Sequence, residues 1–187
     1  MISWLLLFVI GVPFIGCLLC FFTNNVQRVK EVALVTSLIT FLGSCFLWVF
    51  FRNDLSPNQY QFLTEIEWSS SWNLHFSLGI DGISLFFIIL TTFLTPICLL
   101  CSWESIKTQT KEFMMLFLLL EGFLMLVFTV LDLILFYIFF ESVLIPMFIL
   151  IGIWGSSQQR IMAAYQLFLY TLLGSVFMLV AILGIYS

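Results

Sequence analysis

Long apolar runs separated by short polar stretches define the elements of this chain. A helix needs about 20 apolar residues to cross the hydrocarbon core of a bilayer. Six runs reach this length, so the pattern predicts an all-α integral membrane protein with six transmembrane helices. We expect the spans at about 2–22, 32–51, 83–101, 113–130, 132–153 and 161–186.

The fourth and fifth spans lie in one apolar run, residues 113–153, which is too long for a single span and fits two. The only candidate turn between them is Thr129–Asp132. Asp132 is a good N-cap, because its carboxylate can accept hydrogen bonds from the first free N–H groups of a helix. Asp81, just before the third span, is expected to cap that helix in the same way.

The longest polar stretch, residues 52–82, is expected to be an outer loop between the second and third spans. Polar and apolar residues alternate from Tyr60–Phe62 to Trp72–Leu74, which predicts a short β-hairpin within it. The other connections are short. Residues 1–187 are therefore expected to form a single membrane domain.

The composition excludes several classes of protein. Hydrophobic residues make up 63% of the chain and charged residues 9%, against about 45–50% and about 25% in soluble domains. These values exclude a soluble globular domain and a disordered chain. The net charge is −4 and the six Lys and Arg residues are scattered, so we expect no nucleic-acid partner.

The cysteines form two C-x-x-C pairs, Cys17–Cys20 and Cys98–Cys101, a spacing that also occurs in redox and zinc sites. Both pairs lie in or at the end of apolar runs, far along the chain from the only histidine, His75. We therefore interpret them as small apolar residues that face lipid or neighbouring helices. No metal site is expected.

Basic residues are concentrated in alternate loops. The first, third and fifth loops contain five of the six, namely Arg28, Lys30, Lys107, Lys111 and Arg160, and the opposite side contains Arg52. Because Lys and Arg mark the inner side of a membrane protein, these three loops are predicted to face the positive-inside compartment. Both termini are then predicted on the other side.

Two carboxyl side chains, Glu121 and Glu141, lie near the middle of predicted spans. A carboxyl at that depth costs about 3 kcal/mol on insertion scales, and such residues usually face a bundle interior and mark an ion or proton path. Each is ten residues from Leu131, so both lie at one depth, about 15 Å from the turn. We predict that Glu141 transfers protons and that Glu121 is a second carboxyl for the same task. The alternative is that each is simply hydrogen-bonded to a neighbouring helix.

Other polar features lie near Glu141. Pro146 cannot donate to the carbonyl of Ser142, which could then hold a water, or the proline could simply mark a kink. In the last span Gln166, Tyr170 and Thr171 share roughly one face. Interhelical hydrogen bonding is the default interpretation of that face, and a wetted proton path is the alternative.

Several blocks resemble the chain 4 family of NADH–ubiquinone oxidoreductase, and together they cover most of the chain. They are Gly79–Leu85, Leu131–Pro146, Gly152–Gly155 and Ala164–Ser175. The resemblance implies a proton-pumping, antiporter-like subunit of the membrane arm of respiratory complex I. It implies a mitochondrial inner-membrane protein, and together with the distribution of basic residues this predicts both termini on the intermembrane-space side. Glu141 falls on the membrane glutamate of the family's fifth helix, and no family role carries over to Glu121.

The resemblance also has implications for partners and cofactors. Members of the family have about fourteen helices, and the lysine that pairs with the glutamate belongs to the seventh. No lysine follows Lys111 here, so we expect a second polypeptide, from a split gene, to supply the remaining helices beside other membrane-arm subunits. A truncated remnant is the alternative. NADH, FMN, iron–sulfur clusters and ubiquinone are expected in the complex, and none of them on this chain.

The expected function is thus a contribution to proton translocation coupled to NADH oxidation and quinone reduction. The chain itself carries no redox site, so the enzyme is the whole complex. Two alternatives stay open. The chain could belong to a multi-subunit cation/proton antiporter, or it could be a non-pumping membrane scaffold.

Overall fold

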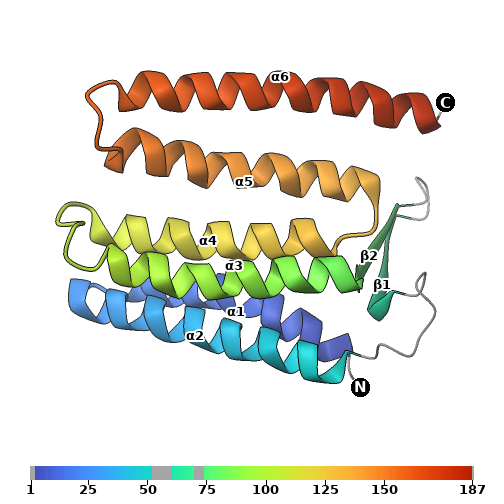
Figure 1. Ribbon diagram of the computed structural model, residues 1–187, viewed down its shortest axis with the longest axis horizontal. Helices are drawn as coiled ribbons and strands as arrows, with labels where there is room; N and C mark the ends of the chain where they lie inside the picture. Colours follow the sequence, from blue (N-terminus) through green and yellow to red (C-terminus); the bar gives the residue numbers. More distant parts are fainter. Residues whose placement is uncertain (1–2, 52–59, 70–73, 187) are drawn as a thin grey trace.

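Six long helices and one pair of strands account for nearly all of the chain that the structure describes, which is residues 3–51, 60–69 and 74–186 of a computed structural model (Figure 1). In order they are α1 (Ser3–Phe22), α2 (Val26–Phe50), β1 (Gln61–Ser69), β2 (Leu74–Ile80), α3 (Gly82–Cys101), α4 (Thr110–Thr129), α5 (Leu133–Trp154) and α6 (Arg160–Tyr186).

The prediction of an all-α membrane protein with six spanning helices is confirmed. Each of the six helices in the described ranges is long and apolar enough to cross a bilayer. The largest difference from the expected bounds is at α2, which begins at Val26 rather than near Val32. Asn25 caps this helix by accepting a hydrogen bond from the backbone N–H of Gln27 at 3.0 Å. The first turns of α2 are polar, so hydropathy locates the span and misses the start of the helix.

The helices are arranged around α4, which packs against α1, α2, α3 and α5. α5 lies between α4 and α6, and α6 lies at the edge of the bundle (Figure 1). The loops that join α1 to α2, α3 to α4 and α5 to α6 are all at one end, and the strands are at the other (Figure 1). Lys107 lies in one of these loops, and the other four predicted loop residues, Arg28, Lys30, Lys111 and Arg160, lie in the first turns of the helices that follow. The five basic residues therefore gather at one end of the molecule, which we call the basic end.

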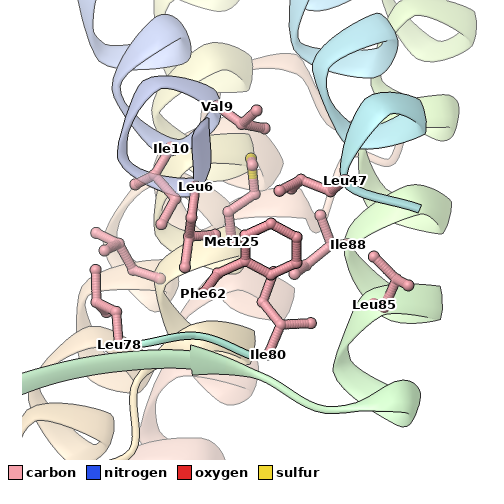
Figure 2. Close-up of a cluster of buried hydrophobic side chains, with 11 residues drawn as sticks. Leu6, Val9, Ile10, Leu47, Phe62, Leu78, Ile80, Leu85, Ile88 and Met125 are labelled. Carbon is pink, nitrogen blue, oxygen red and sulfur yellow. The ribbon is translucent and has the colours of Figure 1, made fainter. Parts of the chain in front are cut away.

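Two clusters of buried apolar side chains lie between the first four helices. One joins α1, α2, α3 and α4 to the strands, and it includes Leu6, Leu47, Ile88, Met125 and Leu78 (Figure 2). The other lies toward the basic end and includes Cys17, Cys20, Val29, Leu99 and Met114. Cys17 and Cys20 are free thiols packed among apolar side chains, as the sequence analysis expects.

Small and hydroxyl-bearing residues let α1, α2 and α3 approach closely. A Cβ on Gly16 of α1 would lie 2.7 Å from Cγ2 of Thr36 on α2. The hydroxyls of Ser44 on α2 and Thr92 on α3 are 2.7 Å apart and hydrogen-bonded inside the bundle. Close packing and interhelical hydrogen bonds are what hold helices together in a bilayer, where apolar burial alone gives no preference for protein over lipid.

The strands β1 and β2 pair antiparallel, as the predicted hairpin requires. The prediction ends the hairpin at Trp72–Leu74, whereas the second strand begins at Leu74 and extends to Ile80, so the predicted range is too short. Trp72, Asn73 and Arg52 lie outside the described residues. The pairing is irregular between Gln61 and Thr64, where Phe62 takes a left-handed φ of 58°. Such a φ is unfavourable for an aromatic residue. Here it accompanies insertion of the Phe62 ring into the apolar cluster of Figure 2.

Candidate functional site

The turn between α4 and α5 positions the two membrane glutamates. α4 ends at Thr129, and the Asp132 carboxylate caps α5 by accepting from the backbone N–H groups of Ile134 at 2.8 Å and Leu135 at 3.2 Å. The predicted turn at Thr129–Asp132 is therefore confirmed, and so is the capping role of Asp132.

The strand pair is attached to this turn. The backbone N–H of Leu131 donates to the carbonyl of Ser77 at 2.9 Å. Leu78 and Val130 form an isolated antiparallel bridge. Phe76 of β2 packs edge-to-face on Phe139 of α5, with ring centroids 6.3 Å apart. The strand pair thus contacts the first part of α5 from outside the helical bundle. One of the contacted residues, Phe139, is two residues from Glu141.

Glu121 lies inside the bundle, on the central helix α4. Its side chain is 1% exposed, and neither carboxyl oxygen has a hydrogen-bond partner among the residues that the structure describes. The neighbouring turn packs on α1, where the Phe14 ring lies against Gly122 and edge-to-face on Phe123 at 5.6 Å. A buried carboxyl without a partner loses its solvation without compensation, so the ionised form of Glu121 is costly at this position.

Glu141 lies on α5 and is partly buried. One of its carboxyl oxygens, Oε1, is inaccessible and has no hydrogen-bond partner. The nearby Ser142 hydroxyl does not serve it, because that hydroxyl donates to the carbonyl of Ile138 at 2.8 Å. α5 runs continuously through Pro146, which has no N–H with which to satisfy the Ser142 carbonyl.

The two glutamates lie at matching positions but are not hydrogen-bonded to each other. Glu121 precedes the last residue of α4 by eight residues, and Glu141 follows the first residue of α5 by eight. At 1.5 Å per residue each is about 12 Å from its end of the turn. Neither α4 beyond Lys111 nor α5 contains a Lys or Arg. An ionised carboxylate at either position has no compensating cation on these two helices.

The polar face of α6 does not contact the other described helices. Tyr165 and Phe168 pack on Phe148 of α5, whereas Tyr170 is 85% exposed. Gln166 and Tyr170 line an open pocket on the free side of α6. Thr171 donates to the carbonyl of Leu167 in its own helix. Within the described chain, the expected interhelical hydrogen bonds from this face are not formed.

Asp81 caps α3, as expected, and lies outside the spans. Its carboxylate accepts hydrogen bonds from the backbone N–H of Ser84 at 2.6 Å and from the Ser84 hydroxyl. These hydrogen bonds lower the pKa of the Asp81 carboxyl, with the hydroxyl having the larger effect. Among the described residues, no three His, Cys, Asp or Glu side chains gather as a metal site would require.

Sequence reasoning missed two contacts of β2, that of Ser77 with the turn and that of Phe76 with Phe139 of α5. No local signal identifies them, because they join residues more than fifty positions apart. It also missed the contact between Lys30 and Trp103, whose carbonyl accepts a hydrogen bond from the ammonium group. The only sequence feature that indicates this contact is the frequent occurrence of basic and aromatic residues at helix ends.

Two sequence families match consecutive parts of the chain, from residue 60 to residue 187. Residues 60–131 match the family described as NADH-ubiquinone oxidoreductase chain 4, amino terminus. Residues 130–187 match the family described as NADH:quinone oxidoreductase/Mrp antiporter, TM. The boundary falls at the turn between α4 and α5, so the second family contains Glu141 and the first contains Glu121.

Curated relatives match nearly the whole chain. NADH-ubiquinone oxidoreductase chain 4 of Marchantia polymorpha is 54% identical over 176 residues, which are 93% of this chain and 35% of the relative. The protein of that name from Arabidopsis thaliana is 53% identical over 173 residues, which are 91% of this chain and 34% of the relative. The chain therefore spans about one third of the length of these relatives.

Solved structures share the fold. Respiratory complex I from Thermus thermophilus with bound NADH contains a chain that superposes with a TM-score of 0.79 at 24% identity, covering 96% of this chain and 35% of that one. The membrane-bound sulfane sulfur reductase, an archaeal respiratory membrane complex, contains one with a TM-score of 0.75 at 17% identity, covering 95% and 27%. At these identities the likeness shows the fold alone.

Proposed function

This chain belongs to the NADH-ubiquinone oxidoreductase chain 4 family, and we propose from that premise that it forms part of the membrane arm of a respiratory NADH:ubiquinone oxidoreductase. Its task there is proton translocation coupled to NADH oxidation and quinone reduction. NADH, FMN, iron–sulfur clusters and ubiquinone bind to other subunits. The membrane is the inner membrane of the mitochondrion.

The observation that carries this proposal is the Glu141 carboxyl. It lies about midway along α5 with one buried, unpartnered oxygen, inside the region that matches the antiporter-like family. A carboxyl in a span is costly and is usually retained for ion or proton transfer. A carboxyl whose ionised form is not locked by a cation can alternate between its two protonation states. Glu141 is therefore the proton-transfer residue.

Glu121 is the second carboxyl of the path. It is more deeply buried than Glu141 and is also unpartnered. It lies at a matching height on the adjacent helix. A water held at each side chain would supply the hydrogen bonds that the buried oxygens lack.

The cation that switches Glu141 must come from helices beyond α6. The relatives are about three times as long as the matched region, so such helices are provided either by the same polypeptide or by a second one. The other membrane-arm subunits and the bilayer are the remaining partners.

The basic end faces the positive-inside compartment. Labelling of Lys107 from one side of the membrane with a membrane-impermeant amine reagent tests this orientation.

Isolation of the native assembly in mild detergent tests the proposal. Mass spectrometry is expected to find this chain with flavin and iron–sulfur subunits and with a polypeptide that carries an intramembrane lysine. NADH oxidation by the reconstituted assembly is expected to drive proton movement across the vesicle membrane. Migration of the chain without any NADH-oxidising subunit would refute the proposal.

The match to a family that includes Mrp antiporters favours one second candidate, a subunit of a multi-subunit cation/proton antiporter. The same glutamate would serve it. Its signature is an assembly without flavin or iron–sulfur subunits that exchanges cations for protons. A non-pumping scaffold would tolerate loss of the Glu141 carboxyl with coupled activity unchanged.

A further inference from the structure

A pocket at the basic end is not used by the proton-transfer site. It has a volume of about 610 Å³ and is lined by the start of α2, the connection between α3 and α4 and the start of α4. Lys30, Lys107, Trp103, Thr110 and Glu104 are among its lining residues. A volume of this size is within the range of about 300–1,000 Å³ of small-molecule sites.

The cationic groups of this pocket are arranged to receive an anion. The Lys30 ammonium donates to the Trp103 carbonyl and lies 5.5 Å from the centre of the Trp103 ring. An ammonium has three donors, so Lys30 is held in place with donors remaining. Lys107 is exposed and forms no hydrogen bond or ion pair within the described chain. Glu104 offsets one of the two positive charges and leaves the pocket with a net positive charge.

Two helix N-termini reinforce this charge. α2 begins at Val26 and α4 at Thr110, and both residues line the pocket. At α4 the preceding residue, Gln109, has a left-handed φ of 51° and makes no capping hydrogen bond through its side chain. The free N–H groups and the positive dipole end of a helix favour anions.

The residues around the pocket indicate its depth in the membrane. Trp103 lines it, and Trp154 lies at the same end and donates to the carbonyl of Thr108 at 3.0 Å. Tryptophans mark the headgroup level of a bilayer. The last turns of α3, which ends two residues before Trp103, expose Ile97 and Leu100, and these side chains can contact acyl chains.

We propose that this pocket binds the phosphate of an anionic phospholipid headgroup, with Lys30 and Lys107 as its cationic ligands. Basic pockets between membrane helices on the inner side recognise such headgroups through charge and hydrogen bonding. A free inorganic phosphate shares this chemistry, and the two sources are distinguished by experiment.

Protection of lysines from amine acylation in the intact membrane assembly tests the site. The assembly is placed in vesicles of phosphatidylcholine, of phosphatidylcholine with phosphatidylglycerol, or of phosphatidylcholine with millimolar inorganic phosphate outside. Mass spectrometry follows acylation of each lysine. Phosphatidylglycerol is expected to slow acylation of Lys107 by about fivefold. Protection by inorganic phosphate alone would assign the site to free phosphate instead of a lipid.

Lys111 provides the matched control. It lies at the same end and, like Lys30, donates to a backbone carbonyl, that of Phe21 at 2.6 Å, but it does not line the pocket. Phosphatidylglycerol is expected to slow acylation of Lys30 as well, because Lys30 also lines the pocket. Lys107→Gln is expected to abolish this protection of Lys30, and Lys111→Gln is expected to leave it intact. Equal slowing of Lys107 and Lys111, or no slowing by either anion, would overturn the proposal.

Discussion

Asp81 and Asp132 show how single residues set the boundaries of membrane helices. Each carboxylate accepts a hydrogen bond from a backbone N–H at the start of its helix. A free N–H group at a helix start has no partner within the helix. The requirement to satisfy it is local, which is why both caps can be identified from sequence.

Replacement of Asp81 by Ala is expected to loosen the start of α3. Loss of an N-cap costs about 1 kcal/mol, and the hydrogen exchange of the Ser84 amide should rise accordingly. Because the pKa of Asp81 is lowered in the fold, its contribution is present above its ordinary value of about 3.9 and is lost as pH falls through the lowered value. Asp81→Asn keeps an acceptor and should keep the protection while removing the pH dependence. Unchanged exchange in Asp81→Ala would contradict the capping role.

Gly16 is required by the close approach of α1 and α2. A Cβ there would lie 2.7 Å from Cγ2 and 2.8 Å from Cβ of Thr36, so Gly16→Ala is expected to destabilise the bundle by about 1–3 kcal/mol through overpacking. Unfolding in a detergent titration measures this. Gly11→Ala, in the same helix with nothing within 4 Å of the new Cβ, is the control. Equal stability of the two variants would show that the helices can separate at little cost.

At the scale of elements, the strand pair fastens the outer end of the bundle. Phe62 and Leu78 enter the cluster around Met125 (Figure 2), and β2 is hydrogen-bonded to Leu131. The hairpin thus links the core of α1–α4 to the start of α5, which carries Glu141. Sequence alternation predicts a hairpin but ends it at Leu74, where the second strand only begins. It does not predict the contact with the turn, because that contact depends on tertiary packing.

Phe76→Ala is expected to weaken this link. The edge-to-face pair with Phe139 contributes about 0.5–1.5 kcal/mol beyond its buried area, and its loss should speed hydrogen exchange at the Leu131 amide. The same substitution at Phe177, which is exposed on α6, should not change that amide. If Phe76→Ala leaves Leu131 equally protected, the hairpin does not hold the turn.

At the scale of the whole molecule, some features of the fold are determined by local sequence and others by tertiary packing. Six helices, the turn at Thr129–Asp132 and the equal depth of the two glutamates follow from hydropathy, capping and helical rise. The rotation of α4 and α5 about their own axes does not follow from these properties, since apolar residues surround each helix and leave no apolar stripe to orient it. For that reason the sequence could not decide whether Glu121 and Glu141 are hydrogen-bonded, and the structure shows that they are not.

The surroundings of the outermost helix, α6, also could not be predicted from its sequence. Gln166 and Tyr170 share a face, which the periodicity of a helix predicts, yet this face points away from α5. Hydrogen bonds from it have to be made with water, lipid or another helix. The same applies to the charge that Glu141 requires, which no residue of α4 beyond Lys111 or of α5 can provide.

The most direct test of the account is the proton yield of Glu141→Gln in the reconstituted assembly. Glutamine preserves the size of the side chain and cannot ionise, so the assembly should form normally. The proton-transfer step should slow by about 10²–10⁴-fold, the usual contribution of a positioned acid–base group. Glu112→Gln, on the exposed first turn of α4, is the matched control and should pump normally. NADH-driven proton translocation that is unchanged in Glu141→Gln would contradict the account and leave a scaffold.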